Sequence, residues 1–207
     1  MGRPTKFLYG ELQSAPLVSR GLVVEQTELG LLRVQINRVH RLNAIDSQLG
    51  RDLTALWEEI SQEPAITAVI VTGSGTEAFS IGLAGGDAAP SNNTNPFSPR
   101  MHGVEQPIVA ALNGLVGGAA YQLLTEADYV IAAEHSTFLQ PSAGTRRVHG
   151  SRPRGSTPSA RPPAFSAAEA HATGLVNEIC LLAELRQRSE EVAHQLSAAP
   201  RGTTHNA

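Results

Sequence analysis

The chain has 207 residues, of which 41% are apolar, and a formal net charge of −3. This length suffices for one globular domain with a hydrophobic core, and the nearly balanced charge argues against nucleic acid or an anionic membrane as a partner. Cys180 is the only cysteine, which excludes an internal disulfide and a cysteine cluster for a metal, and fits a reducing cytoplasm.

The first 20 residues lack the continuous apolar stretch of a secretory signal, so we expect a flexible, untargeted N-terminal segment in a cytoplasmic protein. A hairpin is predicted next, because an apolar run at 22–24 is followed by alternating apolar and polar residues at 32–36. Residues 28–30 would form its turn.

A helix is predicted to begin at Asp46 or Ser47, both good N-cap residues, and to end at residues 62–64. Its apolar face would consist of Leu49, Leu53, Leu56 and Ile60. The apolar run at 68–72, closed by two glycines, is typical of a buried strand in a parallel sheet covered by helices.

Strand and helix alternate again at 108–112, 117–126 and 129–133, which indicates an α/β fold. Residues 88–100 and 144–163 break the pattern, and neither segment has enough apolar residues to order itself. The second of these is either a disordered or irregular loop or an out-of-frame stretch, because Arg, Pro, Gly and Ser dominate it.

A capping box at 166–169 predicts a short helix that Gly174 ends, and a final helix is expected from 181 to about 196. The expected organisation is a flexible segment at 1–20, an α/β core at 21–180 interrupted at 144–163, and a C-terminal helix with a polar tail at 181–207.

Five stretches follow one another along the chain: Asn37-Arg38 with Leu42-Asn43-Ala44, then 78–82, 106–114, 127–133 running on to Phe138 and Pro141, and 166–170 with 174–177. In this order and spacing they resemble the crotonase (enoyl-CoA hydratase/isomerase) superfamily. The resemblance implies an α/β fold, a ClpP/crotonase-like spiral of β-β-α units, here with a truncated C-terminal helical region. It also implies an acyl-CoA thioester as ligand, with no other cofactor and no metal, and a homo-oligomer, either a trimer or a dimer of trimers.

By that resemblance, two backbone N–H groups would stabilise the enolate of the thioester, those of Leu83 and Ala119. The second would lie at the start of a helix, where unsatisfied amides and the helix dipole favour an oxyanion. The backbone of Ala44 and Ile81 would bind the adenine, and His40 and Arg41 would lie near the phosphates.

The two glutamates that hydratases of this family use correspond here to Gln122 and Ser142, and neither side chain exchanges a proton near neutral pH. Classical hydration is therefore expected to be very slow or absent. Possible substitutes for proton transfer are Glu126, Asp87, Tyr121 and His102. For each of them a structural role is the simpler interpretation, a solvated helix end in the case of Glu126.

Three functions remain open on the sequence. The first is an enoyl-CoA hydratase/isomerase family protein, of the lyase or isomerase class in fatty acid metabolism, that binds an acyl-CoA and stabilises its enolate. The second is a decarboxylase or thioester hydrolase, which does not need the two glutamates. The third is a non-catalytic pseudoenzyme or assembly subunit that packs against active relatives.

Overall fold

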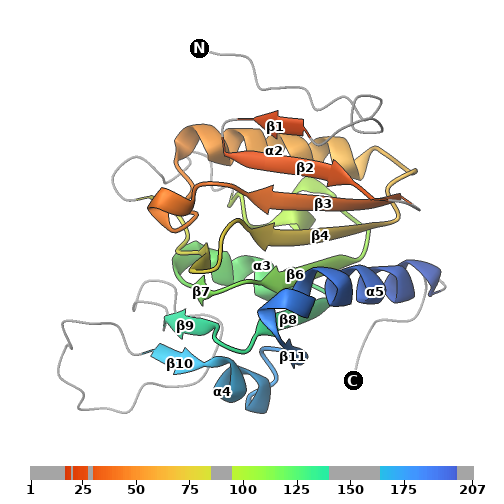
Figure 1. Ribbon diagram of the computed structural model, residues 1–207. Helices are drawn as coiled ribbons and strands as arrows, with labels where there is room; N and C mark the ends of the chain where they lie inside the picture. Colours follow the sequence, from red (N-terminus) through yellow and green to blue (C-terminus); the bar gives the residue numbers. More distant parts are fainter. Residues whose placement is uncertain (1–16, 20, 28–29, 85–94, 140–163, 200–207) are drawn as a thin grey trace.

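The computed structural model describes residues 17–19, 21–27, 30–84, 95–139 and 164–199, which form two β-sheets and the helices around them (Figure 1). The seven strands of the main sheet, in sheet order, are β1 (Leu17–Ser19), β2 (Leu22–Gln26), β3 (Leu31–Ile36), β4 (Ala68–Gly73), β6 (Ile108–Leu112), β8 (Tyr129–Ala133) and β11 (Glu178–Cys180). The four strands of the second sheet are β10 (Ala164–Ser166), β9 (Thr137–Leu139), β7 (Leu115–Val116) and β5 (Ala78–Ser80).

The α-helices α2 (Ser47–Ser61), α3 (Tyr121–Glu126), α4 (Ala167–Ala172) and α5 (Leu185–Ala198) each bury apolar residues in the core. The 3₁₀ segments are η2 (Val39–Arg41), η3 (Pro99–His102), η4 (Gly118–Ala120) and η5 (Leu182–Glu184). None of the described helices is long and apolar enough to cross a membrane.

The chain repeats one unit. Each of the main-sheet strands β4, β6 and β8 is followed directly by a short strand of the second sheet, respectively β5, β7 and β9, before the chain returns to the main sheet. The main sheet is parallel from β3 to β11, as the apolar run at 68–72 predicted. The predicted spiral of β-β-α units is confirmed.

The predicted hairpin is also confirmed, because β2 and β3 pair antiparallel with Val24 opposite Val34. Residues 28–29 of its turn lie outside the described residues. Residues 17–19 form the edge strand β1 and pair with β2, within the segment that the sequence had predicted to be flexible. Three residues are too few to show a period-two pattern in the sequence, so this strand was not predicted.

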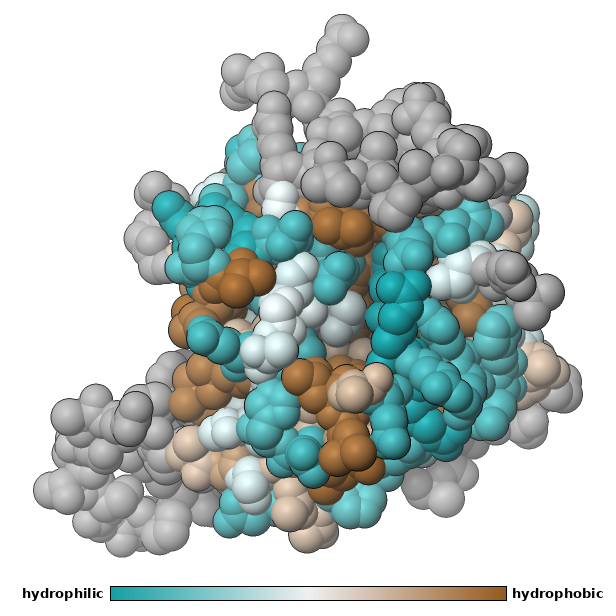
Figure 2. All heavy atoms as spheres, viewed as in Figure 1, coloured by the Kyte–Doolittle hydropathy of each residue, from teal (hydrophilic) through white to brown (hydrophobic). Residues whose placement is uncertain are grey.

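Strand residues alternate between two apolar layers. In β4, Val69 and Val71 face the larger core with α2, α3 and the second sheet, whereas Ala68 and Ile70 face α5. Figure 1 shows α5 in front of the strands β6 and β8, with α2 and α3 behind the sheet. The outer side of α5 is hydrophilic (Figure 2). Both faces of the parallel strands are therefore covered.

Helix α2 begins as predicted, and Asp46 is its N-cap. The Asp46 carboxylate accepts a hydrogen bond from the Leu49 N–H at 3.0 Å and forms an ion pair with Arg38 at 2.6 Å. Burial by itself raises the pKa of Asp46, but the hydrogen bonds from Leu49 and Arg38 outweigh it and hold that pKa below its usual value. The predicted apolar face is buried, and Trp57 extends it.

Three expectations are corrected by the structure. Part of the segment at 88–100 is ordered, because Phe97 and Ser98 are fully buried and the chain continues into η3. The helix predicted at 117–126 is divided into the 3₁₀ turn η4 and α3, and the predicted final helix is divided into η5 and α5.

The predicted capping box is confirmed, because Ser166 and Glu169 form reciprocal hydrogen bonds at the start of α4. Residues 140–163 lie outside the described residues.

Candidate functional site

Two segments of the chain, 42–45 and 81–84, run side by side at one end of the second sheet. The Ile45 N–H donates to the Gly82 carbonyl at 2.9 Å, and the Ile45 carbonyl accepts from the Ala84 N–H at 2.8 Å. Three residues predicted for the site therefore lie in adjoining segments: Ala44, Ile81 and Leu83.

The Leu83 N–H faces away from the 42–45 segment. Backbone groups alternate in direction along an extended chain, so the bonds that Gly82 and Ala84 make to Ile45 turn the Leu83 N–H to the opposite side. In the part of the chain that the structure describes, this N–H donates to no protein acceptor. Within the described ranges it is therefore an unpaired donor, on the second-sheet side of the loop.

The Ala119 N–H lies against the same loop. A Cβ atom placed on Gly82, whose φ is +91°, would stand 2.6 Å from the Ala119 backbone nitrogen. Covalent geometry then puts the Leu83 and Ala119 nitrogens within about 6 Å of each other. The Ala119 N–H also donates to no acceptor among the described residues. The structure therefore brings together the two amides predicted for the oxyanion site.

Gly118 explains why small residues precede Ala119. Its φ is +56°, and a Cβ atom there would lie 2.7 Å from the Ile81 carbonyl oxygen. The turn into η4 can approach the 81–84 segment only with glycine at this position. The Gly117 N–H adds a hydrogen bond to the Ser80 carbonyl at 2.9 Å, which fixes the two segments together.

Three buried polar side chains, those of Asn43, Ser80 and Asn113, hold this arrangement, and none of them was predicted to have this role. Ser80 donates to the Asn43 carbonyl at 2.8 Å and accepts from the Gly82 N–H at 3.0 Å. Asn43 and Asn113 both donate to the Ala78 carbonyl, at 2.7 and 3.0 Å. The sequence did contain a signal for this role, because Ser80 and Asn113 are polar residues at the ends of otherwise apolar strands. A polar group that is buried there needs a hydrogen-bond partner.

Gln122 lies on α3, three residues after Ala119, and its side chain is engaged. Its Nε2 donates to the Glu126 Oε1 at 2.7 Å. Glu126 also accepts from the Ser98 hydroxyl and, at 3.0 Å, from the Arg100 N–H. The interpretation of Glu126 as a solvated helix end was wrong, because its carboxylate joins α3 to the segment that leads into η3. Ser142 and Asp87 lie outside the described residues.

Tyr121 and His102 are both largely buried. The Tyr121 hydroxyl has no partner among the described residues, and burial raises the pKa of this phenol, so it stays protonated at neutral pH. His102 places its Nδ1 3.8 Å from a carboxylate oxygen of Glu58 on α2.

His40 and Arg41 lie in η2, at the start of the 42–45 segment, and both are exposed. No acidic partner is found for either within the described ranges, whereas the neighbouring Arg38 is paired with Asp46. These two cationic side chains are available to an anionic ligand that reaches the loop from solvent.

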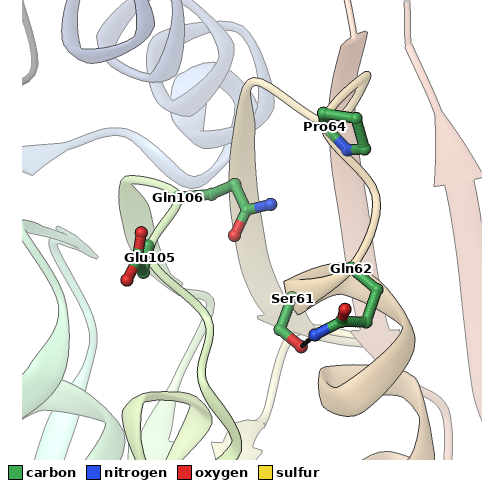
Figure 3. A pocket seen from close by; sticks show the side chains of 5 residues that line it. All are labelled: Ser61, Gln62, Pro64, Glu105 and Gln106. Carbon is green, nitrogen blue, oxygen red and sulfur yellow. Dashed lines mark hydrogen bonds between the residues drawn. The ribbon is translucent and has the colours of Figure 1, made fainter.

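A separate pocket of about 330 Å³ lies at the other end of β6, between the end of α2 and the residues before that strand (Figure 3). Its lining is mainly polar: Ser61, Gln62, Pro64, Glu105 and Gln106. Gln106 donates to the Ile60 carbonyl at 2.9 Å, so it closes the end of α2. The described residues contain no group of three or more His, Cys, Asp or Glu side chains that could hold a metal ion.

Comparison with known proteins gives consistent results. A sequence model of the enoyl-CoA hydratase/isomerase family matches residues 26–145. Carnitinyl-CoA dehydratase of Escherichia coli (strain K12) is 27% identical over 190 residues, which cover 82% of this chain and 72% of that protein.

Two solved structures share the fold. A carnitinyl-CoA dehydratase from Mycobacterium avium 104 aligns with a TM-score of 0.69 and 22% identity, over 88% of this chain and 78% of that one. Enoyl-CoA hydratase from Bacillus anthracis aligns with a TM-score of 0.67 and 22% identity, over 87% of this chain and 78% of that one.

Proposed function

The chain belongs to the enoyl-CoA hydratase/isomerase family, and we propose that it binds an acyl-CoA thioester and stabilises the enolate of that thioester through the Leu83 and Ala119 amides. The observation that carries this proposal is the position of the Ala119 nitrogen, 2.6 Å from where a Gly82 side chain would begin, with the Leu83 N–H turned away from its own hydrogen-bonded neighbours.

Two converging N–H donors suit this chemistry. The thioester oxygen gains negative charge as the enolate forms, and donors that are already aimed at that oxygen need no reorganisation during the reaction. The ring of buried hydrogen bonds around Ser80 and Asn43 supports this rigidity, because it holds the segment that carries Leu83.

The nucleotide part of the coenzyme is assigned to the 40–45 and 81–84 segments. Their backbones adjoin each other next to the Leu83 amide, and His40 and Arg41 supply exposed positive charge at the same edge. A phosphate-bearing ligand would gain charge-assisted hydrogen bonds there, of the order of 1.5–3 kcal/mol each where they are desolvated.

Hydration is not expected from the described residues. Gln122 cannot take up a proton, and the nearby Glu126 carboxylate already accepts three hydrogen bonds. The amides alone favour a reaction that forms an enolate without a base, which is a decarboxylation. This second candidate function rests on the combination of two N–H donors that have no acceptor among the described residues with an amide at position 122.

Calorimetry with free CoA, butyryl-CoA and malonyl-CoA tests both proposals, with release of carbon dioxide followed in the malonyl-CoA samples. Binding of butyryl-CoA tighter than free CoA supports the amide site. Replacing His40 and Arg41 by alanine should weaken the binding of all three ligands by the same factor, because these residues are assigned to the nucleotide, which the three ligands share. Failure of all three ligands to bind would overturn the proposal.

Turnover separates an enzyme from a binding protein. Loss of the crotonyl-CoA chromophore would show hydration and contradict the expected inactivity, whereas carbon dioxide release would support decarboxylation. Binding without either would support the pseudoenzyme. The proposed homo-oligomer is tested on the same sample by light scattering, for which a monomer mass would be the contrary result.

A further inference from the structure

The polar pocket at the end of α2 contains a buried acceptor that has no partner among the described residues. Gln106 is only 6% exposed, and its carboxamide projects into the space between the segment before β6 and the end of α2 (Figure 3). Its Nε2 donates to the Ile60 carbonyl at 2.9 Å and to the Glu63 carbonyl at 3.4 Å. Its Oε1 accepts from no described group. A buried polar atom of this kind calls for a partner, which is either water or a ligand.

The size of the pocket favours a ligand over a single water molecule. Its volume is about 330 Å³, whereas one water molecule takes about 30 Å³ in the liquid. Because the Gln106 Oε1 is itself covered, a ligand reaches it when a side chain of the lining moves. Gln62 is exposed, and its Nε2 bond to the Ser61 hydroxyl is long, at 3.2 Å. An exposed side chain of this kind changes rotamer readily.

The side chains around the pocket offer acceptors and no positive charge. The Ser61 hydroxyl gives its proton to the Glu58 carbonyl at 2.8 Å, and the Gln106 Nε2 is turned towards the carbonyls at the end of α2. Glu105 is exposed, and its carboxylate forms no hydrogen bond or ion pair within the described ranges. The ligand that matches this lining is therefore a hydrogen-bond donor.

The end of α2 adds a negative potential to the pocket. The last carbonyls of a helix carry partial negative charge, and α2 has 15 residues but no basic residue in its last turn. Arg100 bonds the Val104 and Gln106 carbonyls on the adjoining segment. Its charge is paired with Asp128 at 2.7 Å. The donor that fits the pocket is therefore a cation.

The chemistry of the lining selects one kind of cation. No group of three or more His, Cys, Asp or Glu side chains that could hold a metal ion occurs in the described parts of the chain. A quaternary ammonium has no N–H to give to Gln106, and the described lining has no aromatic ring on which such a group could stack. A primary ammonium carries three N–H donors and stays charged at neutral pH.

We propose that this pocket binds a small primary amine in its ammonium form, with the Gln106 Oε1 and the Glu105 carboxylate as the acceptors. The pocket precedes β6, whereas the Ala119 amide follows that strand, so the two sites lie at opposite ends of it. This inference is therefore independent of the proposed function, and the loss of either leaves the other standing.

The test compares butylamine with tetramethylammonium chloride by calorimetry, at constant ionic strength and neutral pH. The wild-type protein should bind butylamine with a dissociation constant in the millimolar range. Tetramethylammonium should bind at least about fivefold more weakly, as the loss of one net hydrogen bond predicts. Equal affinities for the two cations, or no heat of binding at tens of millimolar butylamine, would overturn the proposal.

Glu105→Gln tests the charge of the site without removing a hydrogen bond of the described structure. It should weaken butylamine binding by about threefold or more. Glu134→Gln is the matched control, because Glu134 is also exposed but follows β8 at the other end of the parallel strands. It should leave the affinity within about 1.5-fold of wild type. The same loss in both variants would show a general charge effect and contradict a site at Glu105.

Gln106→Met tests the buried acceptor, because it keeps the length of the side chain and removes Oε1. Butylamine should then bind no more tightly than tetramethylammonium. The substitution also leaves the Ile60 carbonyl without its donor, so unfolding in urea is measured on the same variant. If Gln106→Met does not fold, the comparison of Glu105→Gln with Glu134→Gln still decides the proposal. A preference for butylamine that survives in folded Gln106→Met would refute the role of Gln106.

Discussion

The backbone nitrogen of Ala119 occupies the space that any side chain on residue 82 would need, 2.6 Å from the position of a Cβ atom on Gly82. Glycine at position 82 therefore allows the Leu83 and Ala119 nitrogens, 36 residues apart in the sequence, to lie within about 6 Å of each other. The proposed oxyanion site depends on this approach more than on any side chain.

Gly82→Ala should disrupt the site. An alanine at the positive φ of residue 82 would be strained by about 1–2 kcal/mol. Its Cβ would also collide with the Ala119 nitrogen, at a cost of about 1–3 kcal/mol, and would push the Ala119 amide away. We expect a lower free energy of unfolding in urea and at least tenfold weaker binding of butyryl-CoA. Gly174→Ala is the control, because Gly174 has a φ of +77° but no atom within 4 Å of an added Cβ. Gly174→Ala should lower the free energy of unfolding and leave the affinity for butyryl-CoA unchanged.

Ser80→Ala should weaken ligand binding as well as folding. The Ser80 hydroxyl is fully buried and bonds the Asn43 carbonyl and the Gly82 N–H, so its removal leaves a buried donor and a buried acceptor unpaired, at about 1–3 kcal/mol. Ser136→Ala is matched to it, since Ser136 is equally buried and bonds the Leu112 carbonyl at 3.0 Å. Both variants should unfold more easily in urea, but only Ser80→Ala should reduce acyl-CoA affinity. Equal affinities in the two variants would contradict the role given to Ser80.

The Asp46 cap should make stability depend on pH in the acid range. The folded-state pKa of Asp46 lies below its usual value, so the stabilisation is present above the unfolded-state pKa of about 3.9 and is lost as the pH falls through the folded-state pKa. Asp46→Asn keeps a capping oxygen and removes the charge. The difference in unfolding free energy between wild type and this variant should shrink below about pH 4. A constant difference from pH 7 to pH 2.5 would contradict the assignment.

Glu190→Gln should destabilise the junction of α5 with the sheet. Arg33 projects from β3 towards α5, its side chain is 7% exposed, and its Nη2 lies 2.9 Å from Glu190. Burial lowers the pKa of Arg33, and the hydrogen bond to Glu190 opposes that effect. Because Glu190→Gln removes the charge that pairs with Arg33, it should lower the free energy of unfolding, measured in urea, by about 1–3 kcal/mol.

A double-mutant cycle separates the pair from its surroundings. Arg33→Met together with Glu190→Gln should recover most of the loss, because an apolar residue of similar size replaces the buried charge. Glu191→Gln, at an exposed position on the same helix, should change stability by less than about 0.5 kcal/mol. Additive losses in the double variant would show that the two residues do not interact.

The local features of this protein could be predicted from its residues. The alternation of strands and helices, the Asp46 cap, the Ser166 capping box and the parallel character of β4 all follow from short-range patterns, in which each residue constrains its neighbours within a few positions. The ordered motifs were also sufficient to predict the family and the fold class.

Contacts between distant segments were decided only by the tertiary structure. Glu126 meets Ser98 and Arg100 because α3 packs against η3, and Arg33 meets Glu190 across 157 residues because α5 covers β3. The solvated helix end predicted for Glu126 was wrong for this reason. Periodicity and caps specify which face of an element is apolar, but the register of the sheets and the packing of the helices decide which side chains on different elements come within hydrogen-bonding distance.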